Sequence, residues 1–255
     1  MNFEELLEVA KKLVVSLGKD LIKNVGNTKL KEFEFDKNLP KEIKAKADKF
    51  LEEQFVDSLK PLGISILTEE TGLIMTDEDS DLIFILDPLD GTFNYVKGYG
   101  PCAISLALWK ADTPIFGVIY DLESAKLSWG GKEFGSFTEG EILSVSELKN
   151  TSEASLCSGF PVRFEPEGED LIRFFKVLKQ FAKVRMIGSA AISLNNVAQG
   201  LVDVYYEEDI MLWDVAAGLA ILEGAGGTYS ISLKETRYSV DILAANKELI
   251  ENIKI

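Results

Sequence analysis

Histidine is entirely absent from this 255-residue sequence, and its absence excludes several kinds of catalytic site. Ser-His-Asp triads, Cys-His dyads and zinc sites with imidazole ligands all depend on that side chain. Cysteine is almost as scarce, and the two that occur, Cys102 and Cys157, lie far apart in apolar segments. We therefore expect buried, reduced thiols in preference to a disulfide or a metal-binding pair, which fits a cytoplasmic protein.

Basic residues are also few. The chain carries 27 Lys and Arg against 42 Asp and Glu, a formal net charge of -15, so a nucleic-acid-binding surface built on phosphate contacts is not expected. Cations are the natural partners of such a chain, although most of its acids are expected to be ordinary solvated surface residues. No apolar run approaches the ~20 residues of a membrane span, and acids among the first residues argue against a signal peptide.

The chain does contain enough apolar material for a large core. With 46% hydrophobic residues and no low-complexity tract, we expect a globular protein of one large domain or two closely packed halves. A Gly-rich and polar passage at residues 131–153 marks the expected boundary. It divides the chain into an N-terminal α+β half, residues 1–145, and a C-terminal α/β half, residues 146–255.

Hydrophobic periodicity predicts two N-terminal helices, at residues 3–23 and 41–59, separated by an irregular passage at 24–40. An acidic loop is expected at 77–81, and a short helix or turn from 92 to 98. Strands are predicted at 63–67, 82–86, 102–109, 114–121 and 125–130, the last three of them antiparallel. The second half alternates between strands at 154–158, 182–187, 201–206, 227–231 and 241–244 and helices at 168–180, 190–199 and 214–223. This alternation predicts an α/β (α+β) fold of layered sheets with helices between or outside them.

One apolar strand ends in a pattern that stands out from ordinary core sequence. The strand stops abruptly at Asp87, passes through Pro88 and offers Asp90 three residues later. Because Pro88 cannot donate to a strand ladder and Gly91 permits left-handed backbone, the chain must bend here and can bring the two carboxylates together. Converging carboxylates call for a cation, although an Asp-Gly turn in which Asp90 or Thr92 caps a helix explains the same residues.

Further acids stand at element ends elsewhere in the chain. Glu69 and Glu70 follow another predicted strand, and Asp214 directly precedes a predicted helix, where the residue taken alone is predicted to be the N-cap. Because no histidine or paired cysteine accompanies these acids, the sequence indicates an all-oxygen site for Mg²⁺ or Mn²⁺ and not a zinc site. Asp48, on the second predicted helix, reads from the sequence alone as a solvated helix acid.

A magnesium site of this kind implies a phosphate ester as the substrate. Mg²⁺ held by a few carboxylates commonly takes its remaining ligands from water and phosphate. Two ions about 3.5–4 Å apart can share Asp87 and clamp the attacking and leaving oxygens of an in-line displacement by water. The backbone of Gly91 and Thr92 would offer amides to the phosphate oxygens, and the Thr92 hydroxyl would hold the attacking water.

Two motifs of the chain resemble the signatures of a known family. The run DPLDGTFNY at residues 87–95 resembles the first signature of the inositol monophosphatase superfamily of lithium-sensitive, magnesium-dependent phosphatases. The runs WDVAAG at 213–218 and EGAGG at 223–227 resemble the second, and Glu69-Glu70 resembles the acidic pair that precedes the first. The resemblance extends over nearly the whole chain. It implies a layered α/β/α/β/α sandwich of the inositol monophosphatase and fructose-1,6-bisphosphatase type, and a homodimer.

The resemblance also implies which residues bind metal. Glu69, Asp87 and the main-chain carbonyl of Leu89 match the ligands of a first Mg²⁺ ion. Asp87, Asp90 and Asp214 match the ligands of a second. A third, weaker ion would depend on Glu69 and water molecules, so two or three ions per subunit are expected.

The catalytic roles follow from the same resemblance. Asp48 matches the family's helix acid that hydrogen-bonds the signature threonine, so Asp48 and Thr92 form the implied pair for orienting and deprotonating the attacking water. This replaces the interpretation of Asp48 as a solvated acid. Glu69 is counted with the pair as a catalytic residue, whereas Glu70 is expected to lie outside the ligand set.

Substrate-side positions are implied next to the second signature. Gly188, Ser189, Ala190 and Ala191 resemble main-chain positions that bind polyol hydroxyls, although small residues there also suit close helix packing. Glu207 resembles the glutamate that binds the polyol, and Asp214 lies on the same side.

The charges near these positions favour a neutral polyol phosphate. The acidic run Glu207-Glu208-Asp209 is expected beside the pocket, where it would repel a second phosphate. We therefore expect hydrolysis of myo-inositol 1-phosphate or a similar monophosphate. Fructose 1,6-bisphosphatase activity, alone or as a second activity, is the main alternative, because compact archaeal members of the superfamily resemble dual enzymes and Arg185 is placed to hold a distal phosphate. A phosphoadenosine phosphate 3′-phosphatase is less favoured, and a metal- or phosphate-binding regulatory protein is the alternative without turnover.

Overall fold

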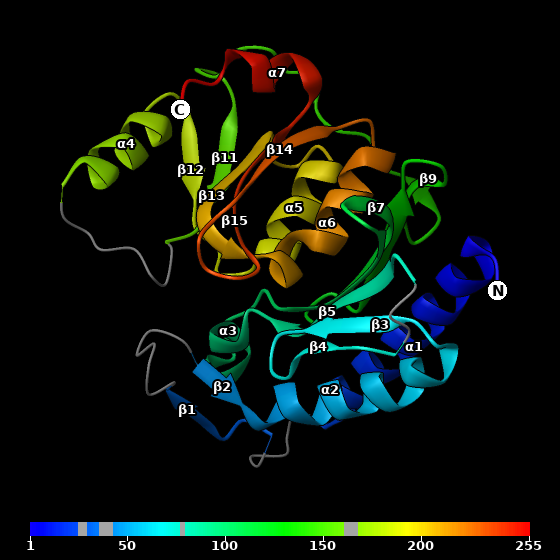
Figure 1. The fold of residues 1–255 in the computed structure, drawn as a ribbon. Coiled ribbons are helices and arrows are strands. Elements are labelled where there is room, and N and C mark those ends of the chain that lie inside the picture. Colours follow the sequence, from blue (N-terminus) through cyan, green and yellow to red (C-terminus); the bar gives the residue numbers. More distant parts are fainter. Residues whose placement is uncertain (25–29, 36–42, 77–79, 161–167) are drawn as a thin grey trace.

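The computed structural model describes residues 1–24, 30–35, 43–76, 80–160 and 168–255. Helices and sheets alternate in layers: a pair of helices, an eight-stranded sheet, a second pair of helices, a five-stranded sheet and an outer pair of helices (Figure 1). The predicted layered sandwich is therefore confirmed. From the first helical layer to the last, the helices are α1 (Phe3–Lys23) and α2 (Lys46–Leu59), α5 (Ala190–Ala198) and α6 (Leu212–Gly224), and α4 (Glu169–Leu178) and α7 (Lys247–Asn252).

Helix α1 forms over the predicted residues because its sequence marks both a start and a buried face. The amide of Glu5 donates to Asn2 Oδ1 at 2.8 Å, and the amide of Asn2 donates to Glu5 Oε2 at 3.1 Å. This reciprocal pair is a capping box, which satisfies amides that the first helical turn leaves free. The apolar stripe includes Leu6, Val14 and Leu21, which are buried against the large sheet.

Helix α2 is shorter than predicted. Residues 43–45, expected to be helical, form strand β2 (Ile43–Ala45), which pairs antiparallel with β1 (Phe33–Phe35). The helix begins where the amide of Ala45 donates to Asp48 Oδ2 at 3.0 Å. The predicted start at Lys41 lies outside the described residues, as do parts of the predicted irregular passage and of the acidic loop at 77–81.

The large sheet is built almost entirely from antiparallel pairs, with β3 and β5 as its one parallel pair among the described residues. The predicted antiparallel order of the three strands between residues 103 and 131 is confirmed. The short strands β4, β9 and β10 were not predicted. The first part of the passage expected to be a boundary, residues 131–153, forms the β9–β10 hairpin. In spatial order the strands are β10 (Glu141–Ile142), β9 (Gly135–Thr138), β8 (Lys126–Gly131), β7 (Thr113–Asp121), β6 (Ala103–Lys110), β5 (Leu82–Asp90), β3 (Ser65–Thr68) and β4 (Gly72–Ile74).

The small sheet mixes parallel and antiparallel pairs. Strand β13 runs parallel to β11 and antiparallel to β15, and it continues to Met211 through a register shift between Glu207 and Ile210. The predicted strand ended at residue 206, so the sequence missed this extension. In spatial order the strands are β12 (Lys183–Arg185), β11 (Ser155–Ser158), β13 (Val204–Met211), β15 (Ser239–Ala245) and β14 (Thr228–Leu233).

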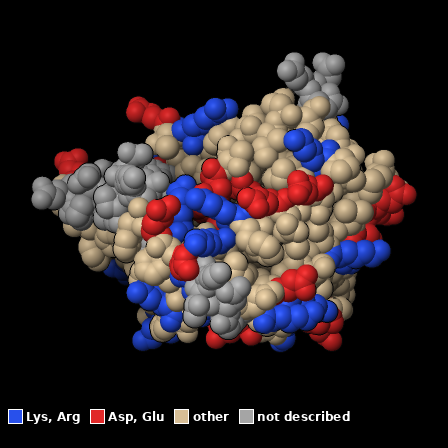
Figure 2. All heavy atoms as spheres, turned by 90° about the horizontal axis from the view of Figure 1, so that it is seen from below, with Lys and Arg blue, Asp and Glu red and all other residues tan. Residues whose placement is uncertain are grey.

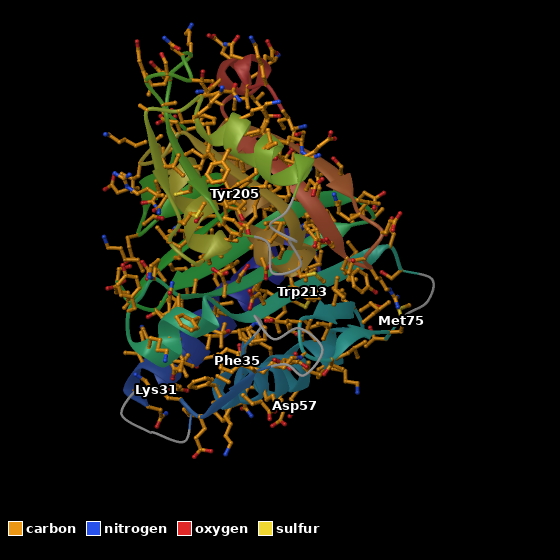
Figure 3. The ribbon with its side chains drawn as sticks, turned by 90° about the vertical axis from the view of Figure 1, so that its left-hand side faces the viewer. Lys31, Phe35, Asp57, Met75, Tyr205 and Trp213 are labelled. Atoms are coloured by element: carbon orange, nitrogen blue, oxygen red, sulfur yellow. The ribbon has the colours of Figure 1, made fainter. Side chains whose placement is uncertain are left out.

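The central helical layer joins the two sheets. Helix α6 is apolar on every side and buried from Val215 to Leu222, as expected for a helix enclosed by other elements. A Cβ added at Gly117 on β7 would lie 2.1 Å from the carbonyl oxygen of Ala217, so glycine allows α6 to rest directly on the large sheet. Figure 3 shows Tyr205 in the small sheet and Trp213, at the start of α6, below it and toward the large sheet.

The cysteines, the charged surface and the length of the helices can also be compared with the predictions. Cys102 and Cys157 are both buried and form no disulfide, as predicted. On the face seen in Figure 2, lysine and arginine side chains are interspersed with aspartate and glutamate, without one continuous basic field. Among the described residues, no helix has the length and apolar character needed to cross a bilayer.

Candidate active site

The predicted bend after Asp87 is a bulge at the end of β5. The strand pairs with β6 up to Asp87, loses register, and pairs again where Asp90 faces Ala103. Asp87 Oδ1 accepts the amide of Leu89 at 3.0 Å, which closes the bulge. Strand β5 therefore presents both aspartates toward one place.

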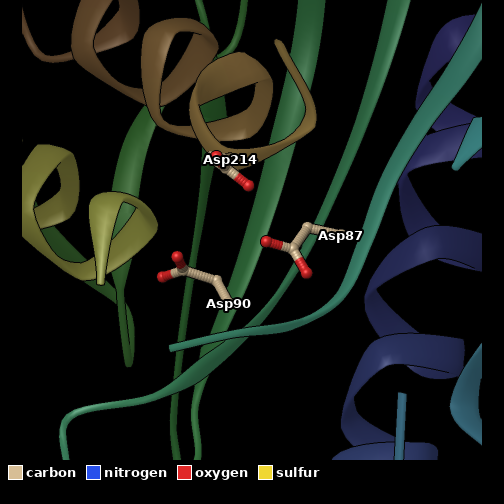
Figure 4. Close-up of side chains that lie close together, drawn as sticks. All are labelled: Asp87, Asp90 and Asp214. Atoms are coloured by element: carbon tan, nitrogen blue, oxygen red, sulfur yellow. The ribbon is translucent and has the colours of Figure 1, made fainter. Parts of the chain in front are cut away.

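A third carboxylate reaches this place from the second half of the chain. Asp214 is the third residue of α6 and accepts the amide of Met211 at 3.3 Å, so the prediction that Asp214 is the N-cap is wrong, because the helix begins at Leu212. One carboxylate oxygen each from Asp87, Asp90 and Asp214 lies within 4.8 Å of the others (Figure 4). The structure thus brings these three predicted metal ligands together.

Asp90 also joins the end of β5 to the start of α5. Its carboxylate accepts the hydroxyl of Ser189 and the amides of Ala190 and Ala191, the latter two at 3.1 Å. These donors form the N-terminus of α5, where unpaired amides and the helix dipole favour a negative charge. No local sequence pattern indicates this contact, which joins residues about a hundred positions apart in the chain.

The cluster is strongly perturbed electrostatically. Burial raises the pKa of Asp87 well above its usual range, and the charges of Glu69, Asp214 and Asp90 raise it further. Burial and Asp90 likewise raise the pKa of Asp214. Burial raises the pKa of Asp90 to about 6, although its hydrogen bonds oppose the shift. Three converging carboxylates that resist ionisation fit an oxygen-preferring cation, whose charge would offset their repulsion.

Thr92 lies beside the cluster and is paired with Asp48. The Thr92 hydroxyl lies 2.9 Å from Asp48 Oδ1 and 2.9 Å from the carbonyl oxygen of Leu89. It can donate a hydrogen bond to either oxygen. Asp48 is only 1% exposed, which contradicts its reading as a solvated helix acid. Burial, together with the charge of Glu70, raises the pKa of Asp48 to about 7 against the opposing effect of the Thr92 hydrogen bond.

Gly91 shapes the turn between these groups. Its φ of 81° lies in the left-handed region, and a Cβ at this position would lie 2.9 Å from the carbonyl oxygen of Pro101. Both features favour glycine. The short helix α3 (Thr92–Lys97) then follows, as predicted.

The two glutamates after β3 have different surroundings. Glu69 lines the pocket that contains the aspartates, although it lies outside their tight cluster. Glu70 instead places its carboxylate 3.3 Å from Lys44 Nζ. The structure therefore turns Glu69, and not Glu70, toward the cluster.

The candidate site is a pocket of about 250 Å³, lined by residues from Glu69 to Thr92 and from Ser158 to Asp214. No lysine or arginine among the described residues lines it. Leu89, Gly91 and Thr92 lie on its wall with the metal-ligand candidates, and the substrate-side residues Gly188, Ser189, Ala190 and Glu207 lie there too. The lining also contains five residues without a predicted role, namely Ser158, Gly159, Phe160, Ser193 and Ile210.

Only the first residue of the expected acidic run lines this pocket. Glu207 accepts the hydroxyl of Tyr205 at 2.8 Å, and burial raises its pKa to about 7. Glu208 instead accepts Arg173 Nε at 3.2 Å and Nη2 at 3.0 Å. Asp209 accepts the hydroxyl of Ser239. The expectation that the whole run borders the pocket is therefore wrong, because successive strand residues alternate in direction and a bulge follows Glu207.

Arg185 is not brought to the pocket. It is exposed on the edge strand β12, and its Nη1 donates to the carbonyl oxygen of Val184 at 3.0 Å. Its predicted contact with substrate stays a prediction without a supporting contact in the structure.

The sequence reasoning gave no role to Asn94, although it belongs to the first signature. Asn94 Nδ2 donates to the carbonyl oxygens of Pro101 at 2.8 Å and Ile187 at 2.7 Å. Asn94 therefore holds the substrate-side segment, which begins at Gly188, next to the metal-ligand segment. The signal that points to Asn94 is a polar residue of the signature that lies inside the short helix α3.

The chain is similar to known proteins over nearly its whole length. A model of the inositol monophosphatase family matches residues 2–253. The fructose-1,6-bisphosphatase/inositol-1-monophosphatase of Aquifex aeolicus is 33% identical over 251 residues, which cover 97% of this chain and 93% of the relative. The inositol-1-monophosphatase of Caulobacter vibrioides is 33% identical over 194 residues, 73% of this chain and 75% of the relative.

Solved structures show the same fold. The inositol monophosphatase of Anabaena (Nostoc) sp. PCC 7120 superposes with a TM-score of 0.82 at 30% identity and covers 99% of this chain and 94% of that one. The extragenic suppressor protein SuhB of Bartonella henselae superposes with a TM-score of 0.85 at 26% identity, over 97% and 96% of the two chains.

Proposed function

The chain belongs to the inositol monophosphatase family, whose members cleave phosphomonoesters, and from this premise we propose that it hydrolyses myo-inositol 1-phosphate to inositol and phosphate with Mg²⁺ as cofactor. The observation that carries the proposal is the pocket in which the aspartate cluster faces Glu207. One end of this pocket suits a cation and the phosphate, and the other suits a hydroxylated leaving group.

The family is metal-dependent, and the acidic cluster fits a bound metal ion. We assign Glu69, Asp87 and the Leu89 carbonyl to one Mg²⁺ ion and Asp87, Asp90 and Asp214 to a second. The cation supplies positive charge that offsets the carboxylate repulsion and polarises the phosphate. Oxygen ligands alone favour Mg²⁺ or Mn²⁺. A third ion near Glu69 belongs to the same proposal.

Residues of the chain then position the attacking water and accept its proton. Thr92 Oγ1 accepts a hydrogen bond from the attacking water. As the water oxygen bonds to phosphorus, one water proton passes to Thr92 Oγ1 and the Thr92 proton passes to Asp48. The ester P–O bond breaks, and the inositol oxygen leaves and takes up a proton from solvent. The distance of 2.9 Å between Thr92 Oγ1 and Asp48 Oδ1 supports this route. The main-chain amides of Gly91 and Thr92 bind the non-bridging phosphate oxygens, where they stabilise the charge that develops in the transition state.

The substrate side favours a polyol with a single phosphate. Glu207 accepts hydrogen bonds from ring hydroxyls, and the main chain at Gly188 to Ala190 closes the opposite wall. Because the described part of the pocket lacks basic side chains, a second phosphate would find repulsion from Glu207 and no compensating cation of the chain.

Fructose 1,6-bisphosphate is the second candidate substrate. It is favoured by the relative from Aquifex aeolicus, whose name contains both activities. Kinetics with Mg²⁺ on myo-inositol 1-phosphate, fructose 1,6-bisphosphate and phosphoadenosine phosphate decide between the candidates. We expect the highest kcat/KM for the inositol phosphate, and a preference of about tenfold or more for the bisphosphate, equivalent to about 1.4 kcal/mol, would overturn that assignment.

Further properties complete the proposal. We propose a homodimer that is inhibited by lithium, because both properties accompany the resemblance of its signatures, and a cytoplasmic location, because both cysteines are buried, reduced thiols. We also propose that residues 1–145 and 146–255 act as two halves, since the strands of the large sheet end at Ile142 and those of the small sheet begin at Ser155. Sedimentation of the purified chain and limited proteolysis test the dimer and the halves.

A further inference from the structure

Glu52 is a buried acid on α2 that does not line the pocket and has no part in the proposed reaction. Its side chain is 5% exposed, and a buried carboxylate is costly unless it is hydrogen-bonded. Glu52 Oε2 accepts the hydroxyl of Thr68 at 2.7 Å and the amide of Glu70 at 3.1 Å, and Oε1 accepts the hydroxyl of Thr71. All these donors belong to the end of β3 and the turn that follows it.

Glu69 stands in the middle of the segment that Glu52 holds. Glu52 accepts hydrogen bonds from the side chain of Thr68, which precedes Glu69, and from the main-chain amide of Glu70, which follows it. These two hydrogen bonds restrain the backbone of Glu69. Glu69 lines the pocket, and its charge raises the pKa of Asp87, so its carboxylate acts on the aspartate cluster. Glu52 thus holds the backbone of Glu69, a proposed metal ligand, without itself lining the pocket.

Helix α2 makes a second contact of this kind one turn earlier. Asp48 accepts the hydroxyl of Thr92, which follows β5, and β5 is the parallel neighbour of β3. Residues four positions apart on a helix lie on the same face. One helix therefore holds the ends of both strands, and the distance between Glu69 and Asp87 depends on it.

We propose that Glu52 is a positioning residue that fixes the Glu69 carboxylate for metal binding and so sets the affinity of the protein for Mg²⁺. The inference rests on the proposed function, because it assumes that Glu69 is a ligand. Residues that orient metal ligands typically contribute about 10–100-fold to metal affinity.

Titration calorimetry with Mg²⁺ on the whole chain tests this role. Glu52→Gln keeps the shape but replaces an accepting oxygen with an NH₂ donor, and Glu52→Asp keeps the charge but withdraws it by one methylene. Both variants should bind Mg²⁺ about 10–100-fold more weakly than the wild type. If charge alone mattered, Glu52→Asp would keep wild-type affinity, and that result would overturn the positioning role.

Kinetics give a second readout that a merely structural acid would not change. The apparent KM for Mg²⁺ should rise by the same factor as the dissociation constant, whereas kcat at saturating Mg²⁺ should change much less. A fall in kcat with an unchanged KM for Mg²⁺ would contradict the inference.

Asp203 offers a matched control. It is also buried, at 8% exposure, and it accepts the amide and the hydroxyl of Ser155, each at 2.7 Å, directly before the first residue of β13. Asp203→Asn should lower the melting temperature without changing Mg²⁺ affinity. If Glu52→Gln behaves in the same way, Glu52 is only a structural anchor and the inference is wrong.

Thr71→Val keeps the test available if the Glu52 variants fail to fold. This exposed residue loses only its donor to Glu52, so Mg²⁺ affinity should fall in the same direction but by less. Unchanged affinity in Thr71→Val would count against the inference. A wild-type chain that binds no Mg²⁺ would instead overturn the proposed metal site, and the inference with it.

Discussion

Thr92 and Asp48 lie 2.9 Å apart, Oγ1 to Oδ1, although 44 positions separate them in the chain. This contact joins α2 to the turn after β5, next to the aspartate cluster. The carbonyl oxygen of Leu89, a proposed metal ligand, lies equally close to the same hydroxyl. The groups assigned to water, to proton transfer and to metal binding are therefore directly connected.

The Thr92 hydroxyl should be required for turnover. Thr92→Val keeps the shape of the side chain but removes the group that holds the attacking water, so kcat should fall about 10²–10⁴-fold, with a smaller change in KM. Thr92→Ser retains a hydroxyl and should keep most of the activity. Steady-state kinetics on the three proteins check this, and a near-normal kcat in Thr92→Val would remove Thr92 from the mechanism.

The stability of the metal-free protein should fall as pH rises. Asp90, with a pKa of about 6, and Asp48 and Glu207, with pKa values of about 7, hold protons in the folded state at a pH where the unfolded carboxyls have lost them. Each such group changes the free energy of unfolding by about 1.4 kcal/mol per pH unit between its unfolded and folded pKa.

Urea unfolding in chelator at pH 5.5 and pH 8 measures this dependence. We expect the larger free energy of unfolding at pH 5.5. Saturating Mg²⁺ should stabilise the protein by about 2.7 kcal/mol per site at 100 times the dissociation constant and should do so more at pH 8, because the ion binds the ionised carboxylates. Equal stability at both pH values without metal would contradict the electrostatic description of the cluster.

Glu207 should affect substrate binding, whereas its neighbour should not. Glu207→Gln weakens the acceptor proposed for ring hydroxyls, so KM for myo-inositol 1-phosphate should rise, by an amount that reflects the loss of about 1–3 kcal/mol. Glu208→Gln is the control, because Glu208 pairs with Arg173 away from the pocket. It should lower stability and leave KM unchanged, and an equal effect of both substitutions on KM would argue against the assigned role of Glu207.

Asn94 should matter for stability more than for chemistry. Asn94→Ala leaves the part-buried carbonyl oxygens of Pro101 and Ile187 without this donor, which should cost about 0.5–1.5 kcal/mol for each hydrogen bond lost. Denaturant unfolding measures the loss. Asn94→Asp should be worse, because a carboxylate cannot donate to either carbonyl. Wild-type stability in both variants would show that the contact does not hold the two segments together.

Much of the fold was predictable because, in several elements, the residues that start the element and the residues that pack on the core indicate the same structure. Helix α1 combines a capping box with an apolar stripe, and its predicted ends are those observed. The strands β1, β4 and β10 have only two or three residues each, and in these strands no alternating pattern stands out from the neighbouring loops. The division of the chain near residue 145 remains a prediction.

The site was predictable from its signatures but not from local pattern alone. Asp48 looked like a surface acid, because nothing near it in the sequence indicates that Thr92 covers it. The position of Asp214 was misjudged, since β13 continues through a bulge and α6 begins directly after it. Contacts such as Asp90 with the start of α5, and Glu52 with the turn after β3, depend on tertiary packing that no local pattern encodes.

Phosphate release from myo-inositol 1-phosphate, measured as a function of Mg²⁺ concentration, tests the central claim most directly. The account predicts saturable release that chelator abolishes, and that Asp87→Asn reduces to background while the chain remains folded by circular dichroism. Release that persists undiminished in chelator, or wild-type protein that releases no phosphate from this ester at any Mg²⁺ concentration, would contradict it.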